Sequence, residues 1–241
     1  MSSAALADYA VTGEPCGSAR MAINGETVML RASGALWLEG LRALIVADLH
    51  FEKGSAFASR GQMLPPFDTR ETLRRLQLEV MATDARVVIF LGDTLHDRRA
   101  GERIADTDRG HIEMLSASRT LVWIRGNHDA DGPQGLPGET VEEMSIGGLR
   151  LRHEPRTGQA PGEVAGHLHP CARVVGKGGS VRRRCFVTDG ERVILPAFGA
   201  YAGGLNIRDA AFSGLFARAP LAVALGQTRA HPVAWNRVVG D

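Results

Sequence analysis

The chain has 241 residues, of which 44% are hydrophobic and 23% are charged, and its formal net charge at pH 7 is +1. This length predicts a single domain over residues 1–241, large enough to fold without a disulfide or a structural metal. The near-neutral charge excludes a strongly basic nucleic-acid-binding chain, although it leaves a local basic patch open.

The termini and the cysteines narrow the class of protein further. Residues 1–20 are rich in Ala, Gly and Ser and are expected to be frayed. Three cysteines without a CxxC pair (Cys16, Cys171 and Cys185) argue against a disulfide scaffold and a thiolate zinc site. The sequence does not begin with the pattern of a secretory signal, in which a basic region precedes an apolar stretch. It also contains no run of about 18 apolar residues, so we expect a cytoplasmic protein that does not engage a membrane.

The N-terminal half alternates strands and helices. Residues 27–38 predict a hairpin around Gly34, and residues 41–47 form a short apolar run, typical of a buried strand, that stops at Asp48. A helix is expected after Pro66, because Asp68 and Glu71 have the spacing of an N-terminal capping pattern. Its buried face is predicted to carry Leu73, Leu76, Val80 and Met81.

Two more strands and a helix complete the predicted core. Strands are expected at residues 86–91 and 121–124, with a helix at 104–115 between them, and this order implies a parallel sheet. From Val141 onward, short apolar runs separated by Gly and Pro predict mostly antiparallel strands. We therefore expect two packed sheets with helices outside.

Polar residues follow three of these strands at the point where each ends. They are Asp48-x-His50, Gly92-Asp93-x-x-His96 and Gly126-Asn127-His128-Asp129. The carboxyl ends of strands form the ligand crevice of open α/β sheets, so distant segments can converge there. His153 and His167-x-His169 also follow apolar runs, and these clusters contain six of the eight histidines.

The residue types in these clusters indicate a metal site. Carboxylate, imidazole and amide ligands without thiolates suit Mn²⁺, Fe or Zn²⁺ better than Ca²⁺ or Mg²⁺ alone. If Asp48-x-His50 and His167-x-His169 are extended, each pair of side chains lies on one face, because strands have a period of two. Arg98 and Arg99 lie close enough in sequence for one of them to steer a phosphate. Asp129 is equally compatible with a cap, a supporting partner or a direct role.

The ordered motifs DxH, GDxxH, GNHD, a lone His and GHxH resemble the calcineurin-like metallophosphoesterase superfamily. The resemblance implies a four-layer α/β sandwich of two packed mixed β-sheets flanked by helices. It also implies two divalent metal ions, one held by Asp48, His50, Asp93 and His169, and the other by Asp93, Asn127, His153 and His167. His128 would be the general acid, His96 would orient it, and a metal-bound hydroxide would attack the phosphorus.

A narrower resemblance concerns the substrate. Residues 47–54, 64–70 and 195–206 are similar to the bacterial ligase-associated DNA damage response endonucleases. This implies Mn²⁺-dependent hydrolysis of DNA phosphodiesters in DNA repair, in association with a DNA ligase and a helicase.

Alternatives remain at this stage. GDxxH and GNHD differ from the GDxxDRG and GNHE of serine/threonine phosphatases, which favours a diesterase. A phosphatase or a small-nucleotide phosphodiesterase is the main alternative. A non-catalytic scaffold is the other, but it would be expected to have lost ligands.

Overall fold

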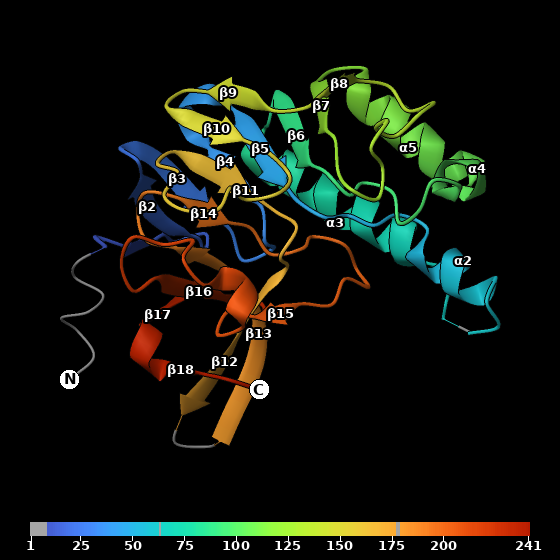
Figure 1. The fold of residues 1–241 in the computed structure, drawn as a ribbon. Helices are drawn as coiled ribbons and strands as arrows, with labels where there is room; N and C mark the ends of the chain where they lie inside the picture. The colour runs from blue at the N-terminus through green and yellow to red at the C-terminus, as the bar shows by residue number, and fades with distance from the viewer. Residues whose placement is uncertain (1–8, 63, 177–178) are drawn as a thin grey trace.

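The computed structural model describes residues 9–62, 64–176 and 179–241, which form two β-sheets (Figure 1). The first sheet contains eight strands that are hydrogen-bonded in chain order. They are β1 (Thr12–Gly13), β2 (Ala19–Ile23), β3 (Glu26–Leu30), β4 (Leu36–Leu38), β5 (Ala43–Val46), β6 (Val87–Leu91), β7 (Thr120–Ile124) and β8 (Glu139–Val141).

The second sheet is built from the strands that follow in sequence. Its main path, in spatial order, is β15 (Leu205–Asn206), β12 (Pro170–Gly176), β13 (Gly179–Thr188), β14 (Val193–Ile194), β11 (Glu163–Ala165), β10 (Leu149–Leu151) and β9 (Met144–Ile146). It is extended by β16 (Leu221–Leu225), β17 (Ala230–Val233) and β18 (Val238–Val239). Among the described strands, the chain therefore passes from the first sheet to the second once, at Glu142 and Glu143.

Strand directions confirm the parallel core and the mostly antiparallel C-terminal half. β5, β6, β7 and β8 are parallel neighbours. In the second sheet, β10 pairs in parallel with β11, and β11 with β14. Six of the nine described strand pairs in this sheet are antiparallel, so the prediction of mostly antiparallel strands is confirmed, and the parallel pairs make the sheet mixed. The connection over 152–162 is long enough to bring the chain back in the same direction, whereas a hairpin turn would have reversed it.

Side-chain alternation in the central strands builds two cores on opposite faces of the first sheet. Ile45 and Ile89 pack between the two sheets, whereas Leu44 and Val88 pack beneath the helices. These helices are α2 (Lys53–Ala58), α3 (Asp68–Thr83), α4 (Ala100–Arg103) and α5 (Asp106–Ser116) (Figure 1). A third core joins the second sheet to Phe212 of the 3₁₀ turn η2 (Ala210–Phe212) and to Trp235 of η3 (Trp235–Arg237). The predicted α/β class of two packed mixed sheets with helices is confirmed.

Three local predictions were wrong. Met81 is 69% exposed, because it lies about 100° around α3 from the buried Val80. Asp68 does not cap that helix: Phe67 is the N-cap and makes no side-chain cap bond, and the Asp68 carboxylate instead accepts from the Gly54 amide. Residues 12–13 and 19–20 are paired strands rather than frayed chain, whereas residues 1–8 lie outside the described residues.

Two further properties concern the chain as a whole. Among the described residues, helices are too short and polar to cross a bilayer. All three cysteines carry free thiols, with Cys171 and Cys185 buried.

Candidate metal centre and active site

The predicted site residues lie beyond the carboxyl ends of strands from both sheets. Asp48 follows β5, Asp93 follows β6 and Asn127 follows β7 in the first sheet. His153 and His167 follow β10 and β11 in the second sheet. The site therefore lies where one end of each sheet meets the other, as expected for the ligand crevice of parallel strands.

Among the described residues, three groups of possible ligand atoms are formed there; two consist only of predicted ligands, and the third joins His50 to His96 and His128. Cluster one is Asp48, His50 and His169, and cluster two is Asp93, His153 and His167; within each, the ligand atoms lie within 4.8 Å of one another. The Nε2 atoms of His50 and His169 are 3.2 Å apart, and Nδ1 of His167 is 3.1 Å from Nε2 of His153. Two nitrogens bound to one tetrahedral cation at 2.0–2.1 Å are separated by roughly 3.3 Å. The facing imidazoles therefore fit one divalent cation per cluster.

Asp93 faces both clusters. Its Oδ2 is 3.9 Å from Nε2 of His50, and its Oδ1 is 3.4 Å from Nε2 of His153. The Asn127 amide oxygen is 2.8 Å from the same His153 nitrogen, which adds an oxygen ligand to cluster two. Asp93 is thus positioned to bridge a pair of cations, and all seven predicted ligands are brought together.

His128 lies at the exposed edge of the site. Its Nδ1 is 2.7 Å from the backbone carbonyl oxygen of His96. Because a carbonyl only accepts, Nδ1 carries a hydrogen, and Nε2 faces the site, 3.9 Å from Oδ2 of Asp93. The His128 side chain is 40% exposed, and its ring stacks on that of His96 at 5.7 Å. The His128 side chain is therefore open to solvent at the edge of the site.

Burial and neighbouring charges push the histidine pKa values in opposite directions. Burial lowers the pKa of His50 to about 3, with the neighbouring His169 acting in the same sense. Burial alone would also lower the pKa of His153, but the Asp93 and Asp48 carboxylates raise it to about 9. Burial would raise the pKa of Asp93, whereas its hydrogen bond and charge interaction with His153 hold that pKa below its usual range. These carboxylates concentrate negative charge where cations would bind.

The backbone is left-handed at five of the seven predicted ligand positions. Asp48, His50, Asp93, His167 and His169 have φ values of +54°, +48°, +45°, +67° and +45°. The assumption that the two x-spaced pairs are extended was therefore wrong, because the chain turns at each ligand. Such conformations cost non-glycine residues free energy and cluster at functional sites.

Buried aspartates hold the ligand loops against one another. Both oxygens of Asp48 accept from the His167 amide, at 3.1 and 3.0 Å, and Oδ1 of Asp93 accepts from the His128 amide at 2.9 Å. Each predicted carboxylate ligand is thus oriented by a loop from a different strand.

Asp129 has the same loop-joining role. It accepts amide hydrogens from Thr94 and Leu95 of one loop and Gly126 of the next. Burial raises the pKa of this carboxyl to about 6. These contacts favour the supporting role among the alternatives that the sequence left open.

The motif glycines permit this close packing. A Cβ on Gly92 would lie 2.5 Å from Cγ of the His153 ring, and one on Gly166 would lie 2.7 Å from Oδ2 of Asp48. Gly199, in the stretch GAYAGG, donates to the Asp48 carbonyl oxygen at 3.2 Å, and its absent side chain leaves room for the Leu49 carbonyl. The glycines are therefore needed for the approach of neighbouring loops.

Glu52 is a supporting residue that the sequence reasoning missed. It is buried, has a φ of +67°, and accepts hydrogen bonds from the hydroxyls of Thr69 at 2.8 Å and Ser55 at 2.6 Å. These bonds tie the loop carrying His50 to the start of α3. The available signal was a carboxylate two residues after the DxH motif, next to a helix.

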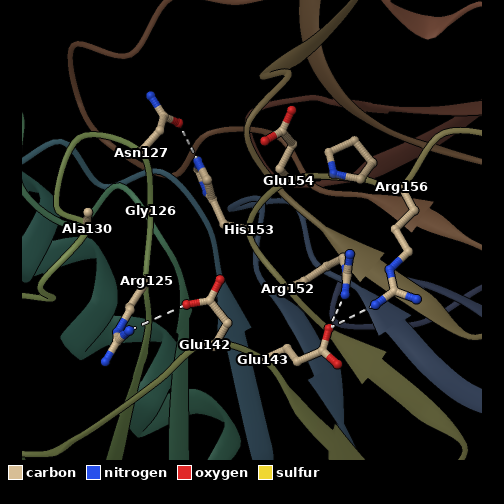
Figure 2. Close-up of a pocket in the computed structure, with 11 residues that line it drawn as sticks. Arg125, Gly126, Asn127, Ala130, Glu142, Glu143, Arg152, His153, Glu154 and Arg156 are labelled. Atoms are coloured by element: carbon tan, nitrogen blue, oxygen red, sulfur yellow. Dashed lines mark hydrogen bonds and ion pairs between the residues drawn. The ribbon is translucent and has the colours of Figure 1, made fainter.

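The two arginines predicted to steer phosphate lie in different surroundings. Arg99 is 82% exposed, and its Nε is 3.5 Å from Glu102. Arg98 lines a cavity of about 330 Å³ together with Asp129 and Asp131. A second cavity, of about 700 Å³, is lined by the predicted ligands Asn127 and His153 (Figure 2).

A protein-family model matches the part of the chain that carries these site residues. The family model described as calcineurin-like phosphoesterase matches residues 41–194, which contain both clusters and His128. The chain belongs to this family. It is therefore a metal-dependent phosphoesterase, a hydrolase whose family binds divalent metals.

Solved structures give two further likenesses. The crystal structure of Pseudomonas putida nuclease MPE is 31% identical to this phosphoesterase, with a TM-score of 0.68, and the match covers 90% of this chain and 100% of that one. The E. coli phosphoesterase Yfce is 16% identical, with a TM-score of 0.39, over 80% of this chain and 99% of that one. A search of curated proteins gives no match.

Proposed function

We propose that this phosphoesterase is a nuclease that hydrolyses DNA phosphodiesters. The observation that carries the proposal is its likeness, over 90% of the chain, to a P. putida nuclease at 31% identity. The exposed edge at His128 supports it, because a phosphate within a longer chain can reach that edge from solvent. Endonuclease action in cytoplasmic DNA repair is the specific form that we propose.

The ligand set supports two divalent cations, and we propose Mn²⁺ at both clusters. Carboxylate, imidazole and amide donors are present in one site, and no cysteine lies in either cluster. When bound by these residues, two cations would supply positive charge to a phosphoryl group and would lower the pKa of water.

The protein's own groups supply the proton and the geometry. In the protonated form, Nε2 of His128 donates to the departing ester oxygen as general acid, a step worth about 10²–10⁴ in rate. The bond from Nδ1 to the His96 carbonyl oxygen fixes the ring orientation. His96 thus acts through its backbone as well as its stacked ring.

The assay that tests this function uses metal-stripped protein restored with Mn²⁺. The substrates are single-stranded DNA, bis-p-nitrophenyl phosphate and p-nitrophenyl phosphate. Metal-dependent cleavage of DNA and the small diester is the expected result. Hydrolysis of the monoester alone would identify a phosphatase, and cleavage of the small diester without DNA would favour a small-nucleotide diesterase. Absence of turnover on all three would support a scaffold.

Association with a DNA ligase and a helicase stays a prediction from the family resemblance. Its test is co-purification of the full-length protein with both enzymes from cells that express all three.

A further inference from the structure

A cavity of about 700 Å³ opens beside cluster two (Figure 2). Asn127 and His153 line it, so it is continuous with the proposed metal centre. Figure 2 shows Arg125 beside Glu142 on one side, and Arg152 and Arg156 converging on Glu143 on the other. The cavity is lined by three arginines and by the three glutamates Glu142, Glu143 and Glu154. Arg125 pairs with Glu142, and Arg152 and Arg156 share Glu143.

Two of these arginines are held by long, solvent-exposed ion pairs. Nη1 of Arg125 is 3.6 Å from Glu142, and Nη2 of Arg156 is 3.6 Å from Glu143. Their side chains are 48% and 54% exposed, so these ion pairs are weak. Arg152 differs, because its mostly buried side chain is bound tightly to Glu143.

The backbone beneath each exposed arginine is fixed. The Arg125 amide donates to the Val141 carbonyl oxygen at 3.0 Å. The Arg156 amide donates to both oxygens of buried Glu163, and its carbonyl accepts from Arg192 at 2.9 Å. An arginine whose backbone is held in place and whose guanidinium can still move is suited to bind phosphate.

We propose that this cavity is the subsite for the nucleotide next to the cleaved bond, and that Arg125 and Arg156 bind its flanking phosphates. The inference rests on the proposed nuclease function. On binding, each guanidinium exchanges a carboxylate partner, Glu142 or Glu143, for a phosphate oxygen. Arg98 and Arg99 are the alternative, but Arg98 lines a different cavity and Arg99 lines neither.

Charge pairing explains how this subsite occurs in a chain with a net charge of only +1. Glu142 and Glu143 offset the arginines when no substrate is present, so the site adds no large positive charge to the free protein. A small diester without flanking phosphates has no group to place on either arginine. The two substrate sizes should therefore respond differently to loss of these side chains.

The test compares the double variant R125Q/R156Q with wild type and with R42Q, all saturated with Mn²⁺. Arg42 is a matched control, because it is 43% exposed, pairs with Asp84 and lies at the opposite end of β5 from Asp48. Steady-state kinetics are measured on a single-stranded oligonucleotide at several salt concentrations and on bis-p-nitrophenyl phosphate. Thermal unfolding confirms that each variant is folded.

The expected result is a KM for the oligonucleotide raised on the order of tenfold in R125Q/R156Q, with kcat little changed. The slope of log KM for the oligonucleotide against log salt concentration should decrease by about 0.7 per lost phosphate contact. Turnover of the small diester and all values for R42Q should stay within about twofold of wild type.

Three outcomes would overturn the subsite. One is unchanged oligonucleotide kinetics in the double variant while the wild type cuts DNA. Another is an equal loss on both substrates, which would mean that the arginines support the metal centre. If the wild type cleaves the small diester but not DNA, the nuclease function fails and the subsite fails with it.

Discussion

His128 is the residue whose position most directly links the geometry to catalysis. We expect His128→Ala to lower kcat for DNA by about 10²–10⁴, because the departing alkoxide loses its proton donor. The loss should be much smaller on bis-p-nitrophenyl phosphate, because p-nitrophenolate leaves without needing a proton. Parallel kinetics on the two substrates measure the difference.

Bound metal per chain should be unchanged in His128→Ala, since the side chain is in neither cluster one nor cluster two; a loss would show that the group of His50, His96 and His128 also holds a cation. An equal loss on both substrates would contradict the assignment of His128 as general acid and indicate a role in binding.

Asp129 provides a second test at the same scale, this time of stability. Its two oxygens accept three backbone amides, and Asn offers only one accepting oxygen. Asp129→Asn should therefore lower the free energy of unfolding by about 1–3 kcal/mol, measured by urea denaturation of the metal-free protein. Asp131→Asn, an exposed carboxylate nearby, should stay within about 0.5 kcal/mol of wild type. Equal stability of the two variants would show that the loop-joining bonds contribute nothing measurable.

At the scale of elements, each ligand loop depends on the close approach of another loop. We expect Gly166→Ala to lower metal affinity at least about tenfold, because the new methyl group meets the Asp48 carboxylate and Ala47. Equilibrium dialysis with Mn²⁺ measures the affinity. If Gly166→Ala binds Mn²⁺ as tightly as the wild type, the close approach of the loops is not required.

Gly110 is the matched control for this substitution. It lies inside α5, and an added Cβ would meet nothing within 4 Å. Gly110→Ala should raise the free energy of unfolding by about 0.5–1 kcal/mol, because alanine loses less backbone freedom in a helix. Metal binding should be unchanged. A destabilised Gly110→Ala would mean that α5 does not tolerate the substitution and that another control is required.

Much of this arrangement could be predicted from the sequence, and the rest depended on contacts between loops. The apolar runs ending at Asp48, Asp93 and Asn127 predicted three parallel strands, because hydrophobic patterning is a local property. The left-handed turns at the ligands could not be predicted, because sequence spacing does not reveal φ. The role of Glu52 was missed for a related reason, since its partner Thr69 lies 17 residues away.

At the scale of the whole molecule, the facing ends of the two sheets share the candidate metal centre. Cluster one combines Asp48 and His50, which follow a strand of the first sheet, with His169 beside the second. Cluster two combines Asp93 with His153 and His167 in the same way. Bound cations would therefore connect the sheets, in addition to the core that lies between them.

Metal removal should consequently lower global stability. A cation at about 100 times its dissociation constant adds about 2.7 kcal/mol if it binds only the folded state. We expect the midpoint of thermal unfolding to rise with Mn²⁺ concentration and to fall with a chelator. In His169→Ala the rise should be smaller, because cluster one has lost its ligand from the second sheet. If the midpoint of thermal unfolding of the wild type does not change with Mn²⁺ concentration, cations do not link the sheets.

The single passage from the first sheet to the second, at Glu142 and Glu143, also sets when activity can begin during protein synthesis. A chain that has left the ribosome only as far as Val141 contains the first sheet but completes neither cluster one nor cluster two. His153, His167 and His169 emerge later, as do β10 and β11, the strands that His153 and His167 follow. A chain that ends before His169 therefore lacks part of cluster one. Phosphoester cleavage is expected only after residues of both sheets have been translated and have met.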